Sequence, residues 1–150
     1  MKLLYSDILP AGIDENQITV TDCFNEQISD CDGIDIAVGY VSKAALEELD
    51  TLIFKHSIGY VNLVMGMYYV DGMPEGTYRT ALALNEKWRD KGVGEIRMVR
   101  AFKYHGKLYV FHKNGDVKSA IIGSANLGVI KLEANNLRQY EVSGLTTELS

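Results

Sequence analysis

The sequence contains few residues of the kinds that mark secreted or membrane proteins. Only two cysteines, Cys23 and Cys31, occur in 150 residues, which excludes a fold held together by many disulfides, and we expect both thiols to be free. No run approaches the roughly 18 apolar residues needed to cross a bilayer, and the N-terminus lacks the apolar core of a signal peptide. We therefore predict a cytoplasmic protein with no membrane partner.

Basic residues are also in deficit, with 15 Lys and Arg against 20 Asp and Glu and a formal net charge of −5. This composition gives no general attraction to nucleic acid, so any such contact must come from a local patch or from another part of a longer protein. The sequence has no internal repeat, low-complexity tract or linker. Its length and its 47% hydrophobic content fit a single globular domain over residues 1–150.

Hydrophobic patterns along the chain alternate between the periods of strands and helices. We expect helices after a cap at Thr21 or Asp22 up to Gly33, from Ser42 to Lys55, and over 77–91. Strands are expected at 34–41, at 60–70 as a central strand buried on both faces, at 94–100, in a hairpin within 104–126, and at 137–145. This order predicts an α/β domain with a mixed sheet covered by helices.

The hairpin sequence "YHGKLYVFHKNGDVKSAIIGSAN" predicts its own register. Asn114-Gly115 is the preferred dipeptide of a two-residue type I′ turn. With that turn, Lys113 pairs with Asp116, and the same register sets His105 opposite Ser124. A three-residue loop would turn Ser124 away from His105.

Four polar side chains then share one face at the open end of the hairpin, because side chains alternate along a strand: His105, Lys107, Ser124 and Asn126. The ammonium, amide and hydroxyl groups suit the oxygens of a phosphoryl group, and a neutral imidazole beside them can attack phosphorus. The cluster contains no carboxylate for a divalent cation, and a lone histidine is a poor metal site. We expect chemistry that needs neither a metal nor a cofactor.

These residues resemble the phospholipase D superfamily, whose signature is His-x-Lys followed by Gly-Ser-x-Asn. The matching residues are His105-Gly106-Lys107 and Gly123-Ser124-Ala125-Asn126. The chain is most similar to the NgoFVII-type restriction endonucleases, through "LLYSDIL", "YHGKLYVF", "GSANLG" and "NNLRQYEV". The resemblance implies a mixed sheet flanked by helices on both faces, and a fragment of a longer enzyme whose DNA-recognition domain lies C-terminal to it.

The resemblance also implies site residues. Family nucleases carry a downstream carboxylate that orients the histidine, and Glu141 matches it better than Glu133. Lipid-cleaving members carry Asp where this chain has His112, which alternation places on the face opposite His105. That departure favours a nuclease over a lipid phosphodiesterase.

Related enzymes use two such motifs, and this chain has one, so a homodimer with a shared active site is expected. The implied reaction is metal-independent cleavage of DNA, in which one His105 attacks phosphorus and the other protonates the leaving oxygen. Three cations before the motif are candidate contacts to the DNA backbone: Arg97, Arg100 and Lys103. The alternatives are a non-catalytic module for dimerisation or nucleic-acid binding, and a lipid phosphodiesterase.

Overall fold

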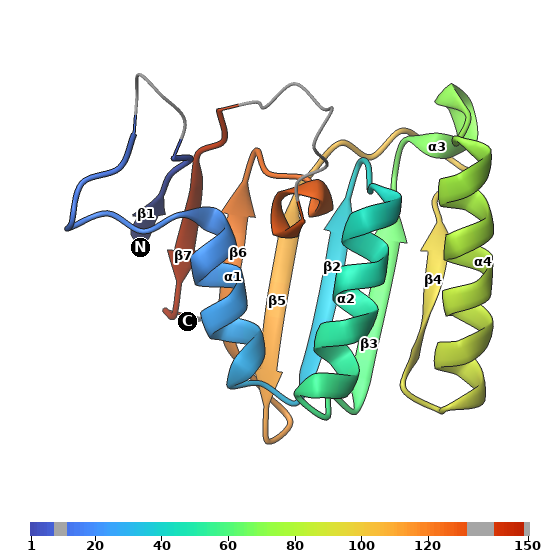
Figure 1. The fold of residues 1–150 in the computed structure, drawn as a ribbon, viewed down its shortest axis with the longest axis horizontal. Helices are drawn as coiled ribbons and strands as arrows, with labels where there is room; N and C mark the ends of the chain where they lie inside the picture. Colours follow the sequence, from blue (N-terminus) through green and yellow to red (C-terminus); the bar gives the residue numbers. More distant parts are fainter. Residues whose placement is uncertain (8–11, 132–139, 149–150) are drawn as a thin grey trace.

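A seven-stranded mixed sheet forms the centre of the computed structural model, which describes residues 1–7, 12–131 and 140–148 (Figure 1). The strands lie in the order β1-β7-β6-β5-β2-β3-β4. Their bounds are β1 Lys2–Leu4, β2 Gly33–Val38, β3 Tyr60–Met65, β4 Gly94–Met98, β5 Leu108–Lys113, β6 Asp116–Gly123 and β7 Ser143–Thr146. The helices are α1 Val20–Ser29, α2 Lys43–Lys55, α3 Tyr68–Asp71 and α4 Glu75–Asp90, with a 3-10 turn, η1, at Leu127–Ile130. The predicted α/β class with a mixed sheet is confirmed.

The direction of the strands brings distant segments to one end of the sheet. β2, β3 and β4 run parallel to one another, while β5 runs antiparallel to β2 and β6 antiparallel to β5. The C-terminal ends of β2 and β3 therefore lie beside the start of β5 and the end of β6. We call this the upper end of the sheet, as it is drawn in Figure 1.

All three predicted helices are present as α1, α2 and α4, and they differ from the predictions at their boundaries, while α3 was not predicted. α2 begins after Ser42, whose hydroxyl accepts a hydrogen bond from the Ala45 N–H at 3.1 Å, and it ends at Lys55 as predicted. α1 begins earlier than predicted, because Thr19 is its cap and accepts from the Asp22 N–H at 3.0 Å. The Thr21 hydroxyl instead donates to the Val129 carbonyl at 2.7 Å, which joins α1 to η1. Within the described residues no helix is long and apolar enough to span a membrane.

The segment 60–70 is not one long strand. β3 stops at Met65, and a single helical turn, α3, follows within the segment predicted as strand. The change occurs at Gly66, whose N–H donates to the Val38 carbonyl at 2.9 Å and whose carbonyl accepts from the Tyr104 N–H at 3.0 Å. A side chain at position 66 would collide with the backbone of Tyr104, so the glycine lets the two segments cross.

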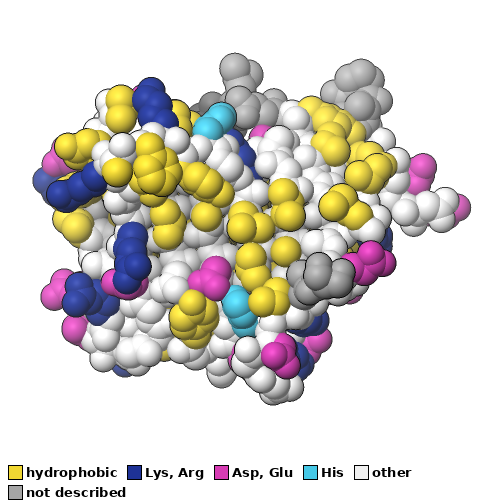
Figure 2. All heavy atoms as spheres, turned by 180° about the vertical axis from the view of Figure 1, so that it is seen from behind, with side chains coloured by type: hydrophobic (Ala, Val, Ile, Leu, Met, Phe, Trp, Pro, Cys, Tyr) yellow, Lys and Arg dark blue, Asp and Glu magenta, His cyan; other side chains and the backbone are white. Residues whose placement is uncertain are grey.

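The three longer helices cover one face of the sheet. In Figure 1, α1, α2 and α4 all lie in front of the strands. One set of alternating strand side chains is fully buried: Ile34, Ile36, Val61, Leu63, Tyr109 and Phe111. Alternate residues on the second face are only half-buried: Ala37, Val64, Leu108 and Val110. Figure 2 shows hydrophobic side chains gathered across the middle of this face. A helical layer on the second face, and burial of β3 on both faces, are thus absent from the described residues.

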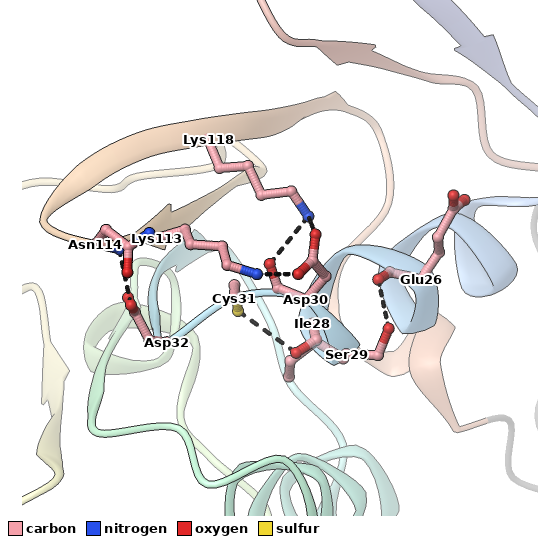
Figure 3. A network of polar contacts seen from close by, with 9 residues as sticks. All are labelled: Glu26, Ile28, Ser29, Asp30, Cys31, Asp32, Lys113, Asn114 and Lys118. Atoms are coloured by element: carbon pink, nitrogen blue, oxygen red, sulfur yellow. Dashed lines mark hydrogen bonds and ion pairs between the residues drawn. The ribbon is translucent and has the colours of Figure 1, made fainter.

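The turn of the β5–β6 hairpin is anchored at the lower end of the sheet (Figure 3). Asn114 and Gly115 have φ of 54° and 84°, as the predicted type I′ turn requires. The Asn114 N–H donates to the carboxylate of Asp32 at 2.8 Å. Lys113 and Lys118 both bind Asp30, and hydrogen bonds from Lys113 and Lys118 hold the pKa of that carboxyl at about 2.

Candidate active site

The segment before β5 carries His105 and Lys107 across the upper end of the sheet. Backbone hydrogen bonds fix it at two points, from Tyr104 N–H to the Gly66 carbonyl at 3.0 Å and from Gly123 N–H to the Lys107 carbonyl at 3.3 Å. His105 is exposed, whereas Lys107 is only 8% exposed. The Lys107 ammonium donates to the His105 carbonyl at 2.6 Å. The imidazole is therefore open to a substrate, and the ammonium is held at the backbone carbonyl of the same residue.

The predicted pairing of His105 with Ser124 is wrong. The turn has two residues, but a β-bulge between Phe111 and His112 shifts the register of the rest of the hairpin. Leu108 pairs with Ile122, one residue away from the predicted partner. The bulge thus moves Ser124 out of register with His105.

Asn126 lies beside His105 at the C-terminal end of β2. Its side-chain oxygen accepts a hydrogen bond from the Tyr40 N–H at 3.1 Å, and its amide N–H groups have no hydrogen-bond acceptor among the described residues. A Cβ on Gly39 would lie 2.9 Å from Cδ2 of His105 and 3.6 Å from Oδ1 of Asn126. Gly39 therefore supplies the space in which the histidine and the asparagine approach each other.

Ser124 and Glu141 form a second pair. The Ser124 hydroxyl donates to the Glu141 carboxylate, and it also accepts from the Val142 N–H at 3.1 Å. The Glu141 backbone is fixed by Ser6, whose hydroxyl accepts from the Glu141 N–H at 2.8 Å. The carboxylate thus contacts Ser124, where we had expected the imidazole of His105. Glu133, the competing carboxylate, lies outside the described residues.

An electrostatic interaction connects Lys107 with Glu141. Burial lowers the pKa of Lys107, and the negative charge of Glu141 opposes that shift. Beneath them the buried Tyr109 hydroxyl donates to the Ala125 carbonyl at 2.7 Å, which fixes the loop between Ser124 and Asn126. The upper end of the sheet therefore brings together one ammonium, one carboxylate, one hydroxyl, one amide and the exposed imidazole.

The three cations expected to touch DNA are exposed and already have neighbours. Arg97 is paired with Glu95, and the Lys103 ammonium lies 3.2 Å from Asp71. The guanidinium of Arg100 lies 5.9 Å from the ring centre of Tyr69. Among the three, Arg100 contacts an aromatic ring where the other two contact a carboxylate.

His112 lies on the second face of the sheet, away from this cluster. Its Nε2 is 2.7 Å from the Asp35 carboxylate, which also accepts from the Tyr60 hydroxyl at 2.7 Å and from the Asn62 amide at 3.1 Å. These contacts give His112 a structural role in a polar group on the sheet face. The part of the chain that the structure describes holds no group of three or more His, Cys, Asp or Glu side chains suited to a metal ion.

Sequence reasoning missed three neighbours of His105. Gly39 makes the close approach, and Tyr40 packs edge-to-face on the imidazole with ring centres 6.0 Å apart. Asp71 accepts a hydrogen bond from the Tyr40 hydroxyl at 2.5 Å. The glycine directly after an apolar strand was the available signal, since glycine there often marks a close contact.

Comparison with known proteins identifies the family of the chain. The family model for the NgoFVII restriction endonuclease N-terminal phospholipase D domain matches residues 17–149. No curated protein matches the chain. The match covers most of the sequence, including both halves of the motif, and it supports a nuclease-related role. The chain belongs to the NgoFVII restriction endonuclease family, through the phospholipase D domain of that family.

Proposed function

We propose that this domain hydrolyses phosphodiester bonds of DNA as the nuclease part of a type II restriction endonuclease. The observation that carries the proposal is an exposed imidazole, His105, set beside the buried ammonium of Lys107 and the amide of Asn126. A ring nitrogen of His105 attacks phosphorus, and the bond from phosphorus to the leaving oxygen breaks. Water then displaces the histidine and releases the phosphate end.

Each neighbouring group has a role in this reaction. Lys107 and the amide N–H groups of Asn126 stabilise the negative charge that develops on the non-bridging oxygens. Ser124 positions the phosphate, and Glu141 acts on the imidazole through Ser124 and Lys107. That path replaces the direct hydrogen bond to His105, since the carboxylate contacts Ser124.

The leaving oxygen needs a proton, and we propose that a second copy of the chain supplies it from its own His105. One imidazole must be neutral and the other protonated for this reaction, so we expect activity to fall on both sides of a pH optimum. The exposed apolar face of the sheet is a surface of the kind that oligomers bury.

The reaction is proposed to need no metal, because the cluster offers ammonium, amide and imidazole groups and one carboxylate that Ser124 already binds. Arg97, Arg100 and Lys103 contact the DNA backbone, with Arg100 the most available. Because the chain has a net charge of −5, we assign recognition of the DNA site to a further domain of the enzyme. We propose a cytoplasmic location for this activity.

The test is cleavage of plasmid DNA, and of the activated diester bis(p-nitrophenyl) phosphate, in the presence of EDTA. We expect turnover in EDTA that is lost in His105→Ala and kept in His56→Ala, a matched change at the end of α2. Acid quenching of the reaction should trap phosphate on His105. A requirement for magnesium contradicts the mechanism, and absence of any turnover or trapped phosphate favours a non-catalytic module.

Mixing wild-type and His105→Ala chains under exchange conditions tests the shared site. If both histidines act on one phosphate, a mixed dimer is inactive, and activity falls with the square of the wild-type fraction. A linear fall means that each chain works alone, which contradicts the dimer while leaving the nuclease activity standing.

A further inference from the structure

The imidazole of His105 makes few contacts with the rest of the protein, although the proposed attack on phosphorus needs a fixed ring position. It lies in a segment without regular structure and is exposed. Among the described residues no hydrogen bond to either of its ring nitrogens is found. The edge of the Tyr40 ring, at 6.0 Å between centres and 79° between planes, is its one aromatic neighbour there. Tyr40 is therefore, with the close approach at Gly39, one of the few contacts that can hold the histidine ring in place.

Tyr40 is itself held at both ends. Its hydroxyl donates to the Asp71 carboxylate at 2.5 Å, and its backbone N–H donates to Asn126 at 3.1 Å. Its ring also packs edge-to-face on Tyr68 at 5.3 Å. Tyr68 is buried, and its hydroxyl accepts from the Val41 N–H at 2.9 Å and donates to the Val41 carbonyl at 2.5 Å. These contacts fix Tyr40 more firmly than an exposed tyrosine is usually fixed.

Asp71 connects Tyr40 to the charges of the site. Hydrogen bonds from Tyr40 and Lys103 lower the pKa of Asp71, and the positive charge of His105 lowers it further. The carboxylate is therefore ionised at neutral pH and close enough to His105 to interact with its protonated form. An ionised acceptor also makes a stronger hydrogen bond with the tyrosine hydroxyl than a neutral one.

We propose that Tyr40, held by Asp71, is a positioning residue that sets the attack geometry of His105 relative to Asn126. This inference rests on the proposed function, because it assigns a role within the same reaction. Tyr40 touches the nucleophile with its ring and the charge-stabilising amide with its backbone, so it fixes the distance between them. Neither Tyr40 nor Asp71 contacts the phosphate in this scheme.

The experiment uses substitutions that separate the parts of this arrangement. Tyr40→Phe removes the hydroxyl that Asp71 holds, and Asp71→Ala removes the acceptor. Asp71→Asn keeps a side-chain oxygen that can accept a weaker hydrogen bond from Tyr40, so it should retain most of the effect that Asp71→Ala loses. Tyr60→Phe is the matched control, because Tyr60 also donates to a carboxylate, that of Asp35, at the lower end of the sheet.

The first readout is structural and needs no activity. The chain has three histidines, so their ring protons can be resolved by NMR and the His105 signals assigned by their loss in His105→Ala. We expect a cross-relaxation signal between the rings of His105 and Tyr40 in the wild type, in Asp71→Asn and in Tyr60→Phe. It should weaken in Tyr40→Phe and in Asp71→Ala.

The second readout is turnover of bis(p-nitrophenyl) phosphate at saturating substrate. A ring displaced from its attack position should lower kcat about tenfold or more with little change in KM, in the same two variants. Thermal unfolding midpoints within the range of Tyr60→Phe exclude loss of fold as the cause. Unchanged ring signals in Tyr40→Phe, or weakened signals with an unchanged kcat, overturn the inference. A chain without diesterase activity refutes the proposed function, while the NMR comparison still decides whether Tyr40 positions His105.

Discussion

Substitution of Gly39 by alanine should reduce turnover without unfolding the protein. The added Cβ would lie 2.9 Å from Cδ2 of His105 and 3.2 Å from Cγ of Met67. Carbon atoms in contact are normally at least about 3.5 Å apart, so the histidine ring must move by about 0.6 Å. Because His105 is exposed, its ring can move outward. Displacement of a reacting group by about 1 Å costs on the order of a hundredfold in rate, and we expect a loss of about 10- to 100-fold in kcat.

The stability of the Gly39→Ala variant should change little. Gly39 is not among the residues with positive φ, so alanine fits its backbone, and the smaller entropy of the unfolded chain stabilises the variant by about 0.4–1 kcal/mol. Movement of the Met67 side chain offsets part of this gain. We therefore expect a free energy of unfolding within about 1 kcal/mol of the wild type.

The assay pairs kinetics with urea unfolding. Gly76→Ala in α4 is the matched control, because a Cβ there meets no atom within 4 Å, and it should leave kcat unchanged. Full activity in Gly39→Ala would refute the close approach of His105 to the end of β2. If activity falls only in proportion to the fraction of folded protein, the claim that Gly39→Ala lowers kcat without destabilising the fold is refuted.

Two further predictions concern the lower end of the sheet and the core. The pKa of Asp30 is lowered to about 2 by Lys113 and Lys118, so its ion pairs stabilise the fold above about pH 4, and this contribution disappears as the pH falls toward 2. Asp30→Asn should therefore lower the unfolding midpoint at pH 6 and not at pH 2; an equal deficit at both contradicts this. Burial raises the pKa of Cys23 and Cys31 to about 11. A disulfide reagent at about pH 8 should therefore label these thiols only when the protein unfolds. Rapid labelling of the folded protein would contradict this prediction.

The order of elements could be predicted because it depends on local patterns. The apolar stripe and serine cap of α2, and the Asn-Gly turn of the hairpin, each depend on residues adjacent in the sequence. The end of β3 could not be predicted, because it is set by the crossing of Tyr104 over Gly66, a contact between distant segments. The short strand β1 was missed because its pairing partner, β7, is the last strand of the chain.

The sequence predicted which residues reach the candidate site, but it did not predict which of them contact one another. The motif residues and Glu141 reach the same end of the sheet because strand directions bring them there, whatever the detailed register. The pairing of His105 with Ser124 was wrong because a bulge intervenes, and nothing within the hairpin sequence marks it. Lys118, which the bulge leaves unpaired in β6, and Lys113 beside the turn both bind Asp30 at the end of α1, a contact that the hairpin sequence does not reveal.

The shift in register changes which residues contact Ser124 and His105, and with them the roles that we propose for these residues. In the predicted register, Ser124 would face His105 and share its phosphate directly. With the bulge, Ser124 binds the carboxylate of Glu141, and the histidine faces Gly39 and Tyr40 at the end of a different strand. In the proposed reaction the nucleophile is therefore positioned by β2 and the segment after it, while the hairpin supplies the ammonium and the amide proposed to stabilise charge. Placing these functions on separate strands means that a change at Gly39 or Tyr40 should affect the position of attack, and a change at Lys107 or Asn126 the stabilisation of charge.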